Sequence, residues 1–226
     1  MYIPNKEQIN IYYTMGTLYH FGDSYGTVGS HDKHFVNLIS ERMDNIKYSN
    51  QVTGGLSNEQ ILTKLLSCVM NIQKGDMLFF NFSFFVRGCY YDRELGELKS
   101  TNYYYNDISK FRIINTEKDY IMDIITHQLD HNEDYNRRVF NQFNTIFEQL
   151  HLMDIPIYYI FIVENEWSDT LLNYGNKISF PTDFYTWLDD NDYHRQEECH
   201  YTRGIQENIY HYVMRQMKKG PHSPLI

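Results

Sequence analysis

The sequence predicts an α/β fold, a three-layer α/β/α sandwich built around a central, mainly parallel sheet. Short β-prone runs alternate with amphipathic segments of helical periodicity along most of the chain. In addition, residues 76–85 are apolar almost without interruption, as in a strand that helices cover on both faces. In such a fold, functional residues collect at the carboxyl ends of the strands.

The first elements form one β-α-β unit. Residues 17–21 are β-prone and end abruptly at a glycine-flanked turn, which predicts a short strand that exposes this turn. Apolar residues recur at helical spacing over 31–43, and residues 47–52 are again β-prone. A second amphipathic helix follows, and either Ser57 or Asn58 is expected to cap its amino end.

The second half of the chain repeats this alternation. We expect a long helix over 134–152, a buried strand over 155–163 and a last helix over about 202–218. Residues 86–128 are rich in tyrosine and weakly periodic, which predicts an irregular excursion with one short helix. The length of 226 residues and the 42% apolar content favour a single domain over 1–226.

Charge and cysteine content exclude several functional classes. The formal net charge is −9 and the 20 lysines and arginines are scattered, so no nucleic-acid partner is expected. The three cysteines suit neither a disulfide framework nor a metal site. Residues 1–10 lack the apolar stretch of a secretory signal, and the longest apolar run, 155–163, is about half as long as a bilayer span requires. We therefore expect a soluble protein without a membrane partner, cytoplasmic or, if of phage origin, part of a virion; the oligomeric state stays open.

The turn after the first strand carries the first chemical motif. Gly22-Asp23-Ser24 ends that strand and is followed by Tyr25 and Gly26. The same three residues occur in ordinary turns, because Asp and Ser side chains bond nearby backbone N–H groups. The pattern nevertheless resembles the first sequence block of the SGNH hydrolases, the GDSL-type esterases and lipases. This resemblance implies the flavodoxin-like fold of that family and Ser24 as the nucleophile.

The loop after the second strand extends the resemblance. About thirty residues beyond Ser24, residues 50–57 resemble the second block, and Gly55 matches its glycine. In the family this residue supplies a backbone N–H to the oxyanion, and a glycine lets the backbone approach the substrate closely. A plain turn between strand and helix is the alternative.

The segment before the last helix resembles the fifth block, in which an acid lies three residues before a histidine. Glu197 and His200 match it, which implies His200 as general base and acid and Glu197 as the carboxylate that orients it. The family usually has Asp at this acid, and Gly204 falls one residue short of the usual glycine. A competing register takes His194 as the base and Asp192 as its acid.

The third block departs most from the family pattern, Gly-x-Asn-Asp, whose asparagine donates to the oxyanion. Asn81 is the nearest amide, but strict alignment of the strand puts Phe85 at the asparagine and leaves Ser83 or Arg87 as substitutes. Loss of one such donor costs roughly 100- to 1000-fold in rate.

Together the blocks imply a serine ester hydrolase that needs no metal or organic cofactor. A small-molecule or glycan ester is the expected substrate, with O-acetyl or other short acyl esters favoured, including those on carbohydrate. The sequence offers no long apolar lid for a lipid tail, and the aromatic residues of 86–128 could lie beside a sugar ring. The alternative is a catalytically silent SGNH-like domain that binds glycan or protein within a larger assembly.

Overall fold

The protein is built on one five-stranded sheet. The structure, a computed structural model, describes residues 16–23, 34–85, 89–92, 97–100, 132–190 and 203–218. The strand order is β2-β1-β3-β6-β7, and every neighbouring pair is parallel. The strands are β1 (Gly16–Gly22), β2 (Ile46–Asn50), β3 (Met77–Phe82), β6 (Ile157–Phe161) and β7 (Asn176–Lys177).

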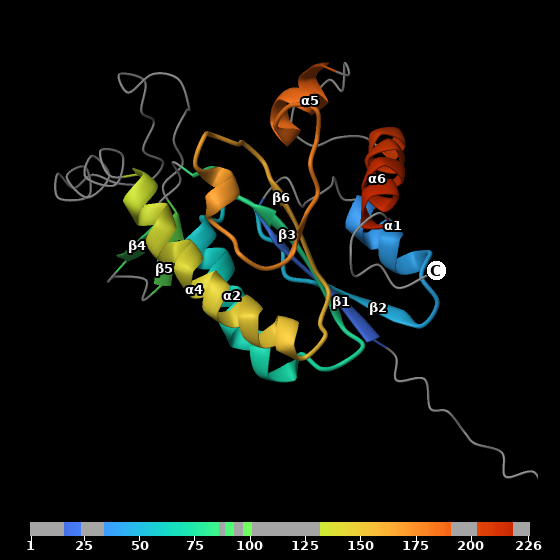
Figure 1. Cartoon of the computed structure of the whole chain (residues 1–226), viewed down its shortest axis with the longest axis horizontal. Coiled ribbons are helices and arrows are strands. Elements are labelled where there is room, and N and C mark those ends of the chain that lie inside the picture. The colour runs from blue at the N-terminus through green and yellow to red at the C-terminus, as the bar shows by residue number, and fades with distance from the viewer. Residues whose placement is uncertain are drawn as a thin grey trace, which may run out of the picture.

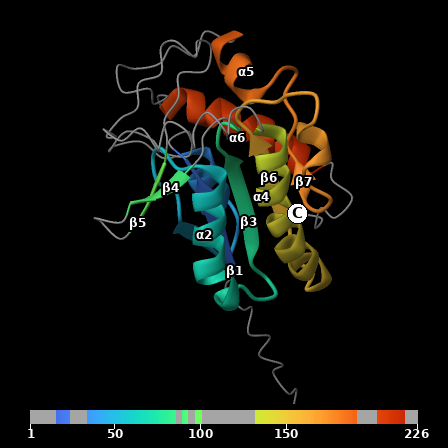
Figure 2. The ribbon, with the colours of Figure 1, turned by 90° about the vertical axis from the view of Figure 1, so that its left-hand side faces the viewer.

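Helices cover both faces of this sheet. α2 (Asn58–Cys68) and α4 (Asn132–Leu152) lie on one face, and α1 (Phe35–Glu41) and α6 (Arg203–Met217) lie on the other (Figure 1). Figure 2 shows α2 and α4 in front of the sheet, with α6 behind it. The predicted three-layer sandwich with a central parallel sheet is therefore confirmed.

Alternation of side chains along the strands divides the core into two halves. Phe80 and Phe82 of β3 pack with residues of α2 and α4, whereas Met77 and Phe79 pack with residues of α1 and α6. The largest fully buried side chains in the two halves are mostly phenylalanines. The apolar run at 76–85 predicted this two-sided burial.

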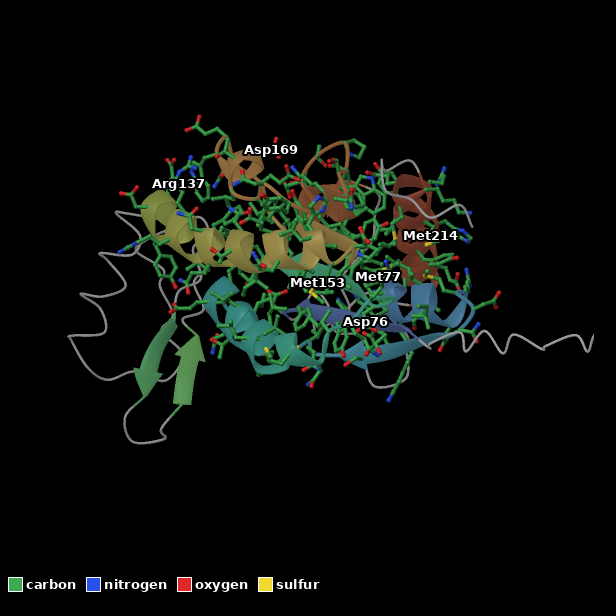
Figure 3. All side chains as sticks on the ribbon, turned by 60° about the horizontal axis from the view of Figure 1, so that its bottom comes forward. Asp76, Met77, Arg137, Met153, Asp169 and Met214 are labelled. Carbon is green, nitrogen blue, oxygen red and sulfur yellow. The ribbon has the colours of Figure 1, made fainter. Side chains whose placement is uncertain are left out.

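Hydrogen bonds to one buried carboxylate link the amino ends of the central strands. Asp76, labelled in Figure 3, is 2% exposed and directly precedes β3. Its Oδ1 accepts from the backbone N–H of Thr17 at 2.7 Å, and its Oδ2 accepts from that of Gln73 at 2.8 Å. The carboxylate thus ties the start of β1 to the turn before β3.

Ser57, one of the two predicted caps, is the N-cap of α2. Its side chain accepts from the Gln60 backbone N–H, while the Gln60 side chain accepts from the Ser57 backbone N–H, which makes a capping box. α2 continues into the 3₁₀ turn η2 (Val69–Asn71), and Gly75 follows with φ of 99°, a conformation that favours glycine.

Several short elements were not predicted. They are η4 (Ser168–Thr170), the edge strand β7 and α5 (Phe184–Asp190). Within the excursion at 86–128, β4 (Cys89–Asp92) pairs antiparallel with β5 (Glu97–Ser100), so part of this segment is regular. The rest of the excursion lies outside the described residues. Among the described helices, none is long and apolar enough to cross a bilayer.

Candidate active site

The carboxyl end of β1 carries the described part of the first motif. Gly22 is the last residue of β1, and the Asp23 side chain that follows is fully buried. The Ser83 hydroxyl, directly after β3, donates to Asp23 Oδ2 at 3.1 Å. The ends of the two central strands are therefore tied together beside the motif. Ser24, the next residue in the sequence, lies outside the described residues, and its role as nucleophile stays a prediction.

A buried asparagine fixes the backbone of Ser83 in turn. The Ser83 N–H donates to Asn58 Oδ1 at 2.7 Å, and Asn58 Nδ2 donates to the Ser83 carbonyl at 3.2 Å. The sequence suggested Asn58 as a helix cap. Its side-chain amide instead bonds both backbone groups of Ser83 at the end of β3. This explains why the strand stops at Phe82, three residues before the predicted end. Ser83, considered as a substitute oxyanion donor, gives its hydroxyl hydrogen to Asp23.

The loop after β2 runs beside the end of β1. The backbone N–H of Gln51 donates to the His20 carbonyl at 2.8 Å, and that of Thr53 donates to the Gly22 carbonyl at 3.2 Å. Gly55, two residues further on, has φ of 80°, where a side chain would be strained. The structure thus places Gly55 in the loop that follows the second strand, as the resemblance implies. Its oxyanion role stays a prediction.

Asn81 lies in register with Gly22 across β1 and β3. Its side chain is fully buried, and its Oδ1 lies 2.7 Å from His20 Nε2. Its Nδ2 has no hydrogen-bond partner among the described residues. A Cβ on Gly22 would lie 2.9 Å from the Cβ of Asn81, so the glycine gives this side chain its place. The oxyanion role of Asn81 also stays a prediction.

Sequence reasoning missed His20, which lies at the centre of a buried network. Its Nδ1 lies 2.8 Å from the Tyr48 hydroxyl, and its ring stacks on that of His34 at 4.7 Å between centroids. Burial lowers the pKa of His20 to about 4, so the imidazole is neutral at physiological pH. Burial also raises the pKa of Tyr48. No local pattern could reveal the network, because Tyr48 is 28 residues and Asn81 61 residues away.

The predicted acid–base residues precede α6 in the sequence and lie outside the described residues. They are His200 and Glu197, with His194 and Asp192 as the competing register. The helix expected over 202–218 begins at Arg203, so the element that follows these residues is as predicted. Their assignment stays a prediction.

An ion-pair cluster lies at the carboxyl end of β7, the outermost strand of the sheet. Lys177 ends β7, and its Nζ donates to Glu164 Oε2 at 2.5 Å and to Asp169 Oδ1 (Figure 3 labels Asp169). Burial lowers the pKa of Lys177, but the two carboxylates outweigh burial and raise it. The cluster holds the loop between β6 and β7 in place.

Neither a protein-family model nor a curated protein matches this sequence. Solved structures do match. The lipase Lip_vut3 from a goat rumen metagenome is 10% identical with a TM-score of 0.52, over 89% of this chain and 97% of that one. TesA is 10% identical with a TM-score of 0.50, over 90% and 98%. A lipolytic protein of the G-D-S-L family from Veillonella parvula is 12% identical with a TM-score of 0.47, over 88% and 96%.

These likenesses concern the fold. The protein is an α/β protein with the SGNH hydrolase fold, and the resemblance drawn from the sequence blocks is confirmed at that level. At about a tenth identity, chemistry has to be argued from the residues of this chain.

Proposed function

We propose that the protein is a serine ester hydrolase of the SGNH type, with Ser24 as nucleophile. The observation that supports this most is the buried Asp23 at the carboxyl end of β1, held by the Ser83 hydroxyl at 3.1 Å. It fixes the residue directly before Ser24 at the sheet edge where α/β proteins bind ligands. A solved structure with the same fold is described as a lipase, which is also an ester hydrolase.

The proposed reaction is acyl transfer in two steps. The Ser24 hydroxyl attacks the ester carbonyl while His200, oriented by Glu197, takes its proton. The Gly55 and Ser24 backbone N–H groups stabilise the oxyanion, and the alcohol leaves with the proton from His200. Water, deprotonated by the same imidazole, then releases the acid. His194 with Asp192 is the competing pair for the acid–base step.

The proposed substrates are short acyl esters, above all O-acetyl groups on carbohydrate. Two features of the sequence support this choice. It offers no long apolar lid that would shield a lipid tail, and residues 86–128 supply many tyrosines of the kind that stack on sugar rings. If no glycan in a panel of O-acetylated glycans lost its acetyl groups, this part of the proposal would be contradicted.

One observation favours the catalytically silent domain as the second candidate. Ser83, one of the residues considered for the third oxyanion donor, is engaged inside the protein, where its hydroxyl donates to Asp23. Phe85, at the position of the family's asparagine by strict alignment, is 3% exposed and packs on Trp167 at 4.8 Å. A domain without this donor would bind glycan or protein without turnover.

The test compares hydrolysis of p-nitrophenyl acetate and labelling by a fluorophosphonate in the wild type and in Ser24→Ala. We expect Ser24→Ala to lose at least roughly 1000-fold in kcat and to lose all labelling. Ser67→Ala is the matched control, because Ser67 is exposed on α2 and its hydroxyl bonds only the Lys64 carbonyl among the described residues.

The histidines are tested next. His200→Ala should abolish turnover while His194→Ala retains it, and the reverse result would select the competing register. A folded wild type that neither turns over nor labels would favour the silent domain.

A further inference from the structure

His20 of β1 and Asn81 of β3 form a hydrogen-bonded pair just before the carboxyl ends of these strands, next to the turn that precedes Ser24. Both side chains are fully buried on the α1/α6 side of the sheet, and His20 Nε2 lies 2.7 Å from Asn81 Oδ1. Asn81 is in register with Gly22, so the pair lies one residue from Asp23. A Cβ on Gly22 would meet that of Asn81 at 2.9 Å, which shows how closely the amide approaches this turn.

The hydrogen bonds define which nitrogen of His20 carries the proton. An amide oxygen only accepts, so Nε2 must donate to Asn81 Oδ1. Nδ1 of the neutral ring is then an acceptor, and the Tyr48 hydroxyl donates to it at 2.8 Å. The low pKa of His20, about 4 because of burial, is consistent with a neutral ring.

The remaining neighbours of His20 are uncharged or aromatic. His34 stacks on it, and its own Nδ1 accepts from the Val36 backbone N–H at 3.2 Å, so this nitrogen carries no proton. Phe79 meets the His20 ring edge-on at 6.2 Å. None of the described residues in contact with His20 is a carboxylate, and burial, which lowers the pKa of His20, outweighs the hydrogen bond to Asn81, which raises it.

This arrangement also fixes the orientation of the Asn81 amide. Because Oδ1 faces His20, Nδ2 is turned away from it, and it has no hydrogen-bond partner among the described residues. A buried donor without a partner costs about 1 to 3 kcal/mol. Such a group is unusual enough to require an explanation, and a catalytic donor that finds its acceptor only with substrate bound supplies one.

We propose that His20 is a positioning residue, which holds the Asn81 amide so that its Nδ2–H group donates to the acyl oxygen of the substrate. The inference rests on the proposed ester hydrolase: Asn81 would be the third oxyanion donor beside the Gly55 and Ser24 backbone N–H groups. His20 is the residue that orients it. With the opposite tautomer of His20 the amide would turn over and present its oxygen, which repels an oxyanion. The tautomer of one buried histidine therefore decides whether Asn81 helps or hinders catalysis.

The test is a pair of substitutions that both remove the imidazole. His20→Phe keeps a ring in the core but has no donor, so the amide loses its orientation, and kcat should fall about 10- to 100-fold with little change in KM. His20→Gln keeps an N–H donor for Asn81 Oδ1 and should recover most of the kcat. Ile39→Val, in the same half of the core, is the control for stability alone and should keep the wild-type kcat.

Three results separate the possible failures. Equal kcat values in His20→Phe and His20→Gln, measured on an active wild type, overturn the inference and leave the proposed function intact. A wild type without esterase activity overturns the proposed function and the inference with it. ¹⁵N NMR of the wild-type imidazole tests the tautomer independently of activity and of the folding of any variant: Nε2–H is expected, and Nδ1–H would overturn the inference.

Discussion

The two faces of the sheet use the same strands for different purposes. On the α2/α4 face, β1 and β3 contribute Phe21, Phe80 and Phe82. Phe21 stacks on Phe80, while Phe80 and Phe82 pack on phenylalanines of α4. On the α1/α6 face, the same strands contribute His20 and Asn81, which bond each other, and His20 also bonds Tyr48. On this second face, polar side chains replace apolar ones where the strands approach the turn before Ser24.

The two faces of the sheet are stabilised in different ways. Aromatic rings bury much apolar area and need no directional partner, so the α2/α4 face is stabilised by packing. Buried polar groups must be paired, and they contribute less to stability, but they fix each other's orientation. A site that depends on the direction of one N–H group gains more from the polar face.

A substitution on the apolar face should cause the greatest loss of stability. Phe82→Ala should lower the free energy of unfolding by about 3 to 5 kcal/mol, because it leaves a cavity among Phe140, Phe143 and Phe161. Urea denaturation measures this loss, and Phe82→Leu is the milder variant if the alanine does not fold. The pH dependence of stability should stay as in the wild type. A loss below about 1 kcal/mol would contradict the packing argument.

The next effect tests the polar face through pH. The pKa of His20 is about 4 in the folded protein and near 6.5 when unfolded. Between these values only the unfolded state binds the proton, so His20 stabilises the fold above pH 6.5 and this contribution is lost as the pH falls. The loss is about 1.4 kcal/mol per pH unit, or about 3 kcal/mol in total.

His20→Phe should therefore lose less stability than the wild type between pH 7 and pH 4.5, whatever its stability at pH 7. Urea midpoints at several pH values measure the slope. Ile39→Val, which removes no titrating group, should keep the wild-type slope. Identical slopes in His20→Phe and the wild type would show that His20 is not the buried, neutral group described here.

A smaller effect tests the close approach of Gly22 and Asn81. Gly22→Ala places a Cβ 2.9 Å from the Asn81 Cβ and 3.1 Å from its carbonyl oxygen. The strands have to move slightly, which should cost about 1 to 3 kcal/mol. In the Asn81→Gly background one of the two clashes is removed, so thermal denaturation should show a smaller cost there. Equal costs in both backgrounds would contradict the contact.

The sequence predicted the fold well because its elements have strong periodic patterns. The strands at 17–21 and 155–163 and the long helix at 134–152 lie within a few residues of β1, β6 and α4. β7 has only two residues and no pattern of its own, since it exists by pairing with β6. The His20–Asn81 pair depends on the register between two strands, which a local pattern does not contain.

The smallest effect concerns a polar cluster that is partly open to water. Lys177, whose side chain is 17% exposed, pairs with Glu164 and with Asp169, whose side chain is 72% exposed. Lys177→Met keeps an unbranched side chain but removes its charge, so the ion pairs and the weak cation–π contact with Phe161 are lost, together at about 1 kcal/mol or less. This loss should shrink further when urea denaturation is repeated in 1 M salt, because salt screens exposed charges. Within the part of the chain that the structure describes, His20, Asn81 and Tyr48 form no ion pair, so their network should respond little to salt. A salt-independent loss in Lys177→Met would remove the distinction between the two polar groups.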